Sequence, residues 1–134
     1  MTENKTPPPG VWPTLRARDA RALIKFLTEA LGFEATVVYA DGDQVHHAEL
    51  AWPAGGGIML GSDRESAVRV TRPGQFSAYV VTADPDALHA RAVAHGATVT
   101  QELYETDYGS RDFAIRDPEG NHWSFGTYPG APRP

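Results

Sequence analysis

Two short groups of polar side chains could carry chemistry in this sequence. His122 and Ser124 are separated by one residue near the C-terminus, and His47 and Glu49 have the same spacing in the first half. Side chains two residues apart in a β-strand point to the same face, so each pair would present its polar atoms together. Such a histidine could act as a base, a hydrogen-bond donor or a metal ligand. A surface role without chemistry explains each pair at least as well.

The composition narrows the classes of protein that fit. The chain has 134 residues and no cysteine, which excludes disulfides, thiolate metal sites and a cysteine nucleophile. A formal net charge of -5 gives no electrostatic reason to expect nucleic acid or a membrane surface as a partner. No apolar run approaches the roughly 20 residues of a membrane span, and residues 1–10 lack the apolar core of a signal peptide. We therefore expect one cytoplasmic domain over residues 11–128, between a flexible leader (1–10) and a frayed tail (129–134).

Hydrophobic patterns predict the elements that would position these side chains. Alternating residues favour strands over residues 11–17, 33–39, 44–52 and 58–61, and again over 76–82, 97–102, 111–115 and 122–127. Asp19 is typical of the cap of a helix that ends at Gly32. Asp84 and Pro85 are typical of the start of a second helix that ends before Gly96. Residues 62–75, with Arg64, Arg69 and Arg72, are expected to form a connector.

The two halves repeat the order strand, helix and three strands. The interval in sequence from Asp19 to Asp84 equals that from Leu23 to Leu88, and it is called the repeat interval below. Gly32 and Gly96 end the two helices, and the interval between them is shorter than the repeat interval by one residue, as a one-residue gap would produce. We interpret the chain as a duplication, with module one over residues 11–61 and module two over residues 76–128.

The turn Asp117-Pro118-Glu119-Gly120-Asn121 is the most specific motif in the sequence. Turn formation explains Asp117 and Glu119 better than acid–base chemistry does. A doubled βαβββ unit with this turn, and with residues 18–33 and 108–113, resembles the vicinal oxygen chelate superfamily of glyoxalases, extradiol dioxygenases and bleomycin-resistance proteins. The resemblance implies an α+β fold in which two βαβββ modules form a cupped mixed sheet, with helices on the outer face. It also implies a ligand cavity and a homodimer.

Enzymes of this family hold one divalent metal with four side chains. The resemblance places the equivalent positions at Trp12, Met59, Ser77 and Ser124, and the repeat interval relates them in pairs. An indole, a thioether and two neutral hydroxyls are poor ligands for such an ion. The sequence is therefore identified as a divergent member without the usual metal ligands, and we expect no cofactor.

In place of a metal site, these positions suit an organic ligand. Trp12, Met59 and Tyr79 offer stacking surface, and Ser77, His122 and Ser124 offer hydrogen bonds. Two further side chains, Arg16 and Arg111, could reach an anionic group of the ligand. The leading hypothesis is a metal-free protein that sequesters or senses an aromatic or antibiotic-like small molecule between two subunits.

Other interpretations stay open. The chain could be a metal-dependent lyase, isomerase or dioxygenase with displaced ligands at His47, Glu49 and His122. It could be a metal-free enzyme that uses His122 with Tyr79 or Ser124. The lining side chains could also simply fill the core, where we place Trp52, Trp123 and Phe125 beneath the helices.

Overall fold

The computed structural model describes residues 9–64 and 72–132. Most of the predicted leader (1–8), part of the connector (65–71, with Arg69) and the last two residues of the tail (133–134) lie outside the described residues.

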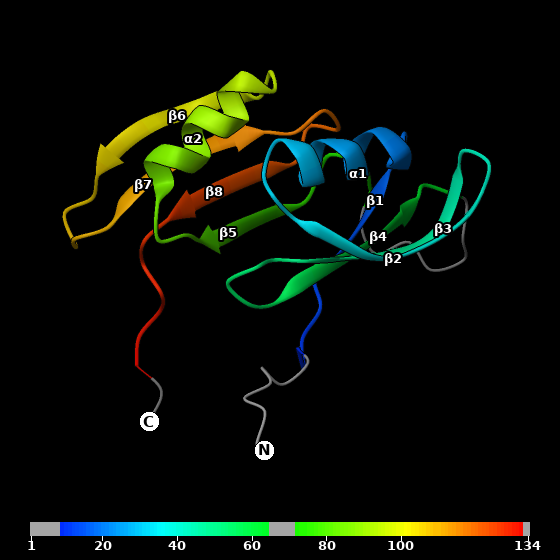
Figure 1. Ribbon diagram of the computed structural model, residues 1–134, viewed down its shortest axis with the longest axis horizontal. Coiled ribbons are helices and arrows are strands. Elements are labelled where there is room, and N and C mark those ends of the chain that lie inside the picture. Colours follow the sequence, from blue (N-terminus) through cyan, green and yellow to red (C-terminus); the bar gives the residue numbers. More distant parts are fainter. Residues whose placement is uncertain (1–8, 65–71, 133–134) are drawn as a thin grey trace, which may run out of the picture.

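Each half of the chain forms one βαβββ module (Figure 1). Module one contains β1 (Thr14–Ala17), α1 (Ala20–Glu29), β2 (Glu34–Asp41), β3 (Gln44–Ala51) and β4 (Gly57–Ser62). Module two contains β5 (Ser77–Val81), α2 (Pro85–Ala94), β6 (Thr98–Glu105), β7 (Arg111–Arg116) and β8 (His122–Gly126). The strand orders are β1-β4-β3-β2 and β5-β8-β7-β6, and the first pair of each order is parallel while the others are antiparallel. This confirms the predicted α+β fold of two βαβββ modules, and each module forms a four-stranded mixed sheet.

The duplication is visible in the register of the two sheets. Thr14 lies opposite Met59 on β4, and one repeat interval later Tyr79 lies opposite Ser124 on β8. The helices begin at Ala20 and Pro85, which are separated by the same interval.

Local chemistry explains where the two helices and the first strand begin. Asp19 accepts a hydrogen bond from the backbone N–H of Ala22 at 3.1 Å, and Asp84 caps α2 in the same way at 3.0 Å. The first strand is shorter than predicted, since it begins at Thr14 rather than at residue 11. Pro13 has no N–H to donate, and only its carbonyl joins the ladder, by accepting from Met59 at 3.0 Å.

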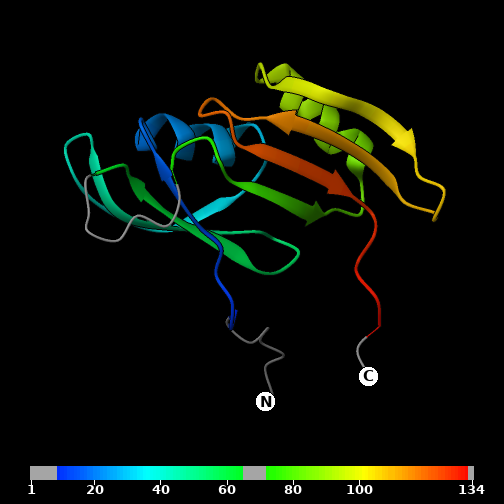
Figure 2. The same cartoon turned by 180° about the vertical axis from the view of Figure 1, so that it is seen from behind.

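One hydrophobic core is shared by both modules. Its members come from α1, α2 and the buried faces of both sheets, and include Leu23, Leu27, Leu88, Phe113 and Trp123. In Figure 1, α1 lies above the sheet of module one and α2 lies in front of β6 and β7, and Figure 2 shows the molecule from behind. The sheet face opposite the helices is called the open face below. Within the described residues, neither 10-residue helix is long and apolar enough to cross a membrane.

Hydrogen bonds hold the two modules together at both ends of α1. At the start of α1, the Glu119 carboxylate accepts from the backbone N–H groups of Arg18 at 2.7 Å and Asp19 at 2.9 Å. At its end, Arg91 of α2 donates to the carbonyls of Thr28 and Glu29. The turn between β7 and β8 is thus part of the junction between modules.

Candidate functional site

Strand alternation places most of the predicted site on the open face. In β8, Trp123 and Phe125 are completely buried beneath the helices, and His122 and Ser124 point to the other side. On β5, Ser77 lies opposite His122, and Tyr79 lies opposite Ser124. Ser77 and His122 are exposed, and Ser124 is half-buried.

Module one presents the equivalent positions. Met59 is half-buried and lies between Thr14 on β1 and Glu49 on β3. Trp12 is also half-buried, and its ring lies over Gly57, where an added Cβ would be 3.0 Å from the indole. Trp12, Met59, Ser77 and Ser124 therefore all lie on the open faces, and their indole, thioether and hydroxyl groups are poor donors for a divalent ion.

The displaced ligands proposed for a metal enzyme do not meet within the chain. The Nε2 atom of His47 lies 2.8 Å from a carboxylate oxygen of Glu49, on β3 of module one. His122 belongs to the other sheet, where its Nε2 atom lies 3.1 Å from the hydroxyl of Thr100. Within residues 9–64 and 72–132, no three His, Asp or Glu side chains are grouped closely enough to hold an ion.

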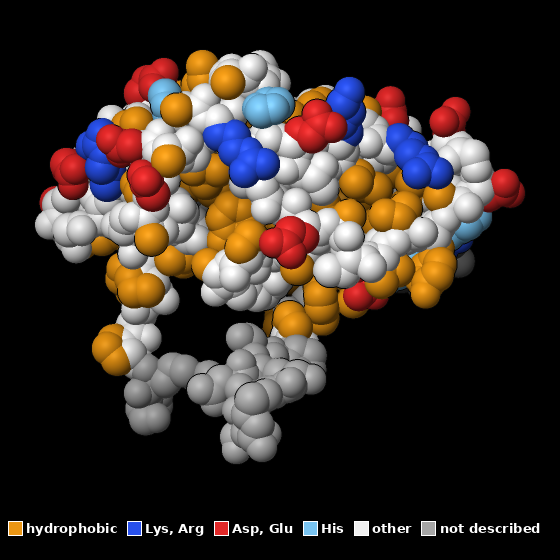
Figure 3. Space-filling view, in the orientation of Figure 1, with side chains coloured by type: hydrophobic (Ala, Val, Ile, Leu, Met, Phe, Trp, Pro, Cys, Tyr) orange, Lys and Arg blue, Asp and Glu red, His pale blue; other side chains and the backbone are white. Residues whose placement is uncertain are grey.

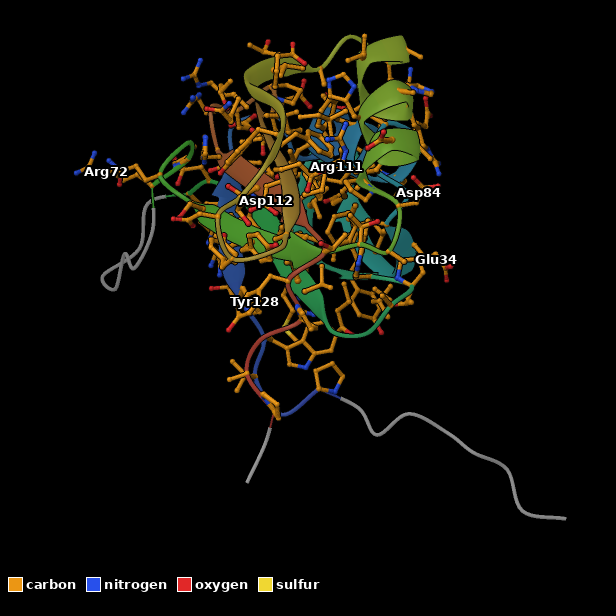
Figure 4. The ribbon with its side chains drawn as sticks, turned by 90° about the vertical axis from the view of Figure 1, so that its left-hand side faces the viewer. Glu34, Arg72, Asp84, Arg111, Asp112 and Tyr128 are labelled. Carbon is orange, nitrogen blue, oxygen red and sulfur yellow. The ribbon has the colours of Figure 1, made fainter. Side chains whose placement is uncertain are left out.

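The two predicted arginines have different positions. Arg16 is half-buried on the open face of module one, and its guanidinium lies over Gly61. It forms no hydrogen bond or ion pair with the described residues. The prediction for Arg111 needs correction, because this residue shares the helix-facing side of β7 with Phe113. It pairs with Asp86 of α2 at 2.6 Å and with Glu105 of β6 at 3.1 Å, on the side of the molecule that faces the viewer in Figure 4.

The ion pair between Arg111 and Asp86 shifts the pKa values of both side chains. The hydrogen bond from Arg111 holds the pKa of Asp86 below its ordinary value, against the opposing effect of desolvation. The same hydrogen bond raises the pKa of Arg111. Arg111 is therefore a surface link between α2 and β6, and it is not available to a ligand on the open face.

A cavity of about 420 Å³ lies at the β5 edge, between the two modules. Its walls include Phe33, Trp52, Tyr79, Val81, Trp123 and Pro129. In Figure 3, hydrophobic side chains are exposed where the terminal segments leave the two sheets. This volume lies within the range of small-molecule sites.

Trp52 packs against the hydrophobic core, as the sequence predicts. It is half-buried and also forms part of the cavity wall, which the sequence does not predict. Its indole N–H donates to the carbonyl of Val81 at 2.9 Å, which ties the β3–β4 hairpin to the end of β5. Rings of Phe33 and Phe125 lie 4.9 and 6.3 Å from the Trp52 ring.

Sequence reasoning missed one polar group on the open face of module two. Asp112 is only 6% exposed, and its carboxylate accepts from the hydroxyls of Ser110, of Tyr79 at 3.2 Å and of Tyr108 at 3.5 Å. The clue was the alternation of β7, where Phe113 faces the helices and Asp112 must face away.

The comparisons with known proteins agree with this architecture. The chain matches the Glyoxalase/Bleomycin resistance protein/Dioxygenase superfamily over residues 11–125. A search of curated protein sequences found no match. Among solved structures, TioX from Micromonospora sp. ML1 is similar, with 26% identity, a TM-score of 0.72, and coverage of 88% of this chain and 98% of that one.

Two more distant structures share the fold. TnmS3, an antibiotic binding protein from Streptomyces sp. CB03234, has 22% identity, a TM-score of 0.67, and coverage of 85% of this chain and 90% of that one. Lactoylglutathione lyase from Agrobacterium tumefaciens has 23% identity, a TM-score of 0.66, and coverage of 90% and 95%. The paired βαβββ modules and the match over nearly the whole domain show that this chain belongs to the glyoxalase/bleomycin resistance protein/dioxygenase superfamily.

Proposed function

We propose that this chain is a small-molecule binding protein that sequesters or senses a flat aromatic or antibiotic-like ligand without using a metal ion. The observation that carries the proposal is the apolar, aromatic cavity at the β5 edge, next to open faces whose metal positions hold Trp12, Met59, Ser77 and Ser124.

The chemistry of the lining supports an organic ligand. Trp52 and Tyr79 offer ring surface for a planar molecule, and such contacts contribute beyond simple burial. Ser77, Ser124 and His122 offer hydrogen bonds on the adjoining face. The guanidinium of Arg16 on module one, unpaired among the described residues, suits an anionic group of the ligand. The antibiotic binding protein TnmS3 shares the fold, which is consistent with this use of it.

We also propose that the protein acts as a homodimer. The open faces carry large exposed side chains, including Tyr39 at 64% and Tyr79 at 41%. A second copy that covers these faces would remove apolar surface from water and would enclose a ligand between the subunits. Size-exclusion chromatography with light scattering tests this part, and a monomer at micromolar concentrations would contradict it.

The metal part of the proposal is tested by elemental analysis of protein purified without a chelator. We expect no stoichiometric Zn, Ni, Mn or Fe. About one such ion per chain would overturn the metal-free proposal and would favour the enzyme alternative, in which His47, Glu49 and His122 act as ligands.

The cavity part is tested with 2-naphthylmethanol, a neutral planar probe, titrated against tryptophan fluorescence. Ala54→Leu should weaken binding by about tenfold, because this exposed residue of the β3–β4 hairpin lines the cavity and a larger side chain would occupy it. Ala90→Leu, at an exposed position of α2, is the matched control and should leave the Kd within about twofold. Equal affinity in both variants would show that the probe binds elsewhere.

A further inference from the structure

We propose that Asp112 and the tyrosines around it form a subsite for a cationic group of the ligand, of the alkylated or quaternary ammonium class. The inference rests on the proposed function, because it concerns the polar end of the same ligand site. The subsite consists of Asp112, Tyr79, Tyr104, Tyr108 and Tyr128, and is called the tyrosine–aspartate cluster below.

The cluster gathers nearly all the tyrosines of the chain. Of five in the sequence, only Tyr39 lies outside it. Tyr104 lies directly opposite Asp112 on β6, so both side chains occupy the same face. The rings of Tyr108 and Tyr128 meet edge to face at 5.7 Å, and the backbone N–H of Tyr128 donates to the Tyr79 hydroxyl at 3.2 Å. Asp112 and Tyr128 are both labelled in Figure 4, which shows the left-hand side of the molecule as seen in Figure 1.

The fold makes room for the cluster at one glycine. Gly126 on β8 lies opposite Asp112, and a Cβ at this position would collide with the Asp112 carboxylate and the Tyr79 hydroxyl. The two polar groups therefore meet directly above the backbone of β8. Tyr79 can reach from β5 to β7 only because the strand between them carries no side chain here.

Asp112 has no cationic partner within the described part of the chain. Among the residues that the structure describes, no Lys, Arg or His forms an ion pair with it, and Arg111 beside it is used by Asp86 and Glu105. Its known partners are hydroxyl donors, which an ionised carboxylate needs because it can only accept. These hydroxyls satisfy the hydrogen bonds, but they leave a full negative charge in a poorly solvated position.

The rings around this charge are well suited to a cation. Exposed fractions of 41% for Tyr79, 42% for Tyr104, 61% for Tyr108 and 44% for Tyr128 leave ring surface open to a ligand. Partial desolvation and the neighbouring Asp112 carboxylate raise the pKa of Tyr108, so its phenol stays neutral at physiological pH. A cation over several tyrosine faces gains from the ring quadrupoles, and a buried carboxylate within reach adds an attraction that salt screens weakly.

The cluster is continuous with the cavity. Tyr79 lines the cavity and its hydroxyl donates a hydrogen bond to Asp112, and Pro129 of the cavity wall directly follows Tyr128. A ligand with an aromatic body in the cavity could therefore place a cationic substituent at the cluster. The chemistry identifies the ligand class as an aromatic compound that carries an ammonium group.

The test compares two probes at pH 7.5 and low salt by isothermal titration calorimetry. One is (2-naphthylmethyl)trimethylammonium, and the other is neutral 2-naphthylmethanol. The unmodified protein should bind the cation at least about tenfold more tightly than the neutral probe. Asp112→Asn should reduce this preference to about twofold or less, while the affinity for the neutral probe changes little.

Two further variants keep the result interpretable. Tyr108→Leu removes one exposed ring together with its long hydrogen bond to Asp112, and it should reduce the preference by about two- to fivefold. Asp43→Asn removes the same charge from an exposed turn of module one and should leave the preference unchanged. This control separates the cluster from the net charge of the protein.

The outcomes distinguish this inference from the proposed function. If both probes bind equally, the cation subsite is wrong and the binding function stands. If neither probe binds, both proposals fail. A preference that survives in Asp112→Asn, with circular dichroism showing a folded protein, would exclude Asp112 as its source.

Discussion

Replacing Glu119 should uncouple the two modules at the start of α1. The side chain is 6% exposed and lies in the β7–β8 turn of module two. Its two oxygens accept separate hydrogen bonds from module one, at 2.7 Å from the N–H of Arg18 and 2.9 Å from that of Asp19. The carboxylate also faces the positive end of the α1 dipole. Glu119→Ala removes all of these interactions at once.

The expected loss can be worked out from these contacts. A hydrogen bond to a charged group contributes about 1.5–3 kcal/mol. Arg18 and Asp19 are exposed residues, so water can reach the released amides, and the lower end of the range applies. Two bonds then give about 3 kcal/mol, a large share of the roughly 5–15 kcal/mol by which domains of this kind are stable. The ion pair between Glu119 and Arg18 at 3.8 Å adds little, because the Arg18 side chain is 63% exposed.

Urea denaturation followed by circular dichroism and tryptophan fluorescence measures this loss. Glu119→Gln keeps one acceptor oxygen and should cost about half as much as Glu119→Ala. Glu102→Gln is the matched control, because Glu102 is 73% exposed on β6, and it should change the free energy of unfolding by less than about 0.5 kcal/mol. A loss below about 1 kcal/mol in Glu119→Ala would refute the assignment of Glu119 as the link between modules.

Three other substitutions test separate parts of the structure. Asp117→Ala should destabilise the fold by about 3–5 kcal/mol in urea denaturation. The reason is that this buried carboxylate accepts hydrogen bonds from two backbone amides, an amide side chain and an indole. A loss under about 1 kcal/mol would contradict this role of Asp117. Gly126→Ala should cost about 1–3 kcal/mol by the same assay, since its methyl group displaces Asp112; an unchanged stability would contradict the close packing. Asp86→Asn should lower the Tm at pH 7 by removing the pair with Arg111. Because its pKa is lower in the folded state, ionised Asp86 stabilises the fold at pH values above its ordinary pKa of 3.8. The Tm difference between the unmodified protein and Asp86→Asn should therefore disappear as the pH falls below 3.8, and a constant difference would contradict the pairing.

Most of the fold could be predicted because its determinants are local. Asp19 and Asp84 mark the helix starts through hydrogen bonds within one turn, and Gly32 and Gly96 end them with positive φ values of 93° and 81°. The constant repeat interval then relates the strands of the two modules. The boundary of the first strand was wrong because side-chain alternation extends through Pro13, whereas the ladder needs a donor that proline lacks.

The site was harder to predict because it depends on which face and which neighbour a side chain meets. The prediction for Arg111 took no account of strand alternation, although Phe113 and Ile115 already define the helix-facing side of β7 that Arg111 shares. The prediction for Trp52 gave its packing against the core but not its place in the cavity wall. Its position follows from how the β3–β4 hairpin of module one packs against β5 of module two, and no local pattern encodes that contact.

The duplication also allows the Asp112 carboxylate to be compared with the equivalent position in module one. Asp112 and His47 are one repeat interval apart and occupy equivalent places, each opposite a tyrosine: Tyr104 in module two and Tyr39 in module one. In module one, the Nε2 atom of His47 is paired with the Glu49 carboxylate on the same strand. The residue equivalent to Glu49 in module two is an alanine, which cannot offer such a partner. On our proposal, this strand position is paired within the strand in module one and receives the cationic group of the ligand in module two.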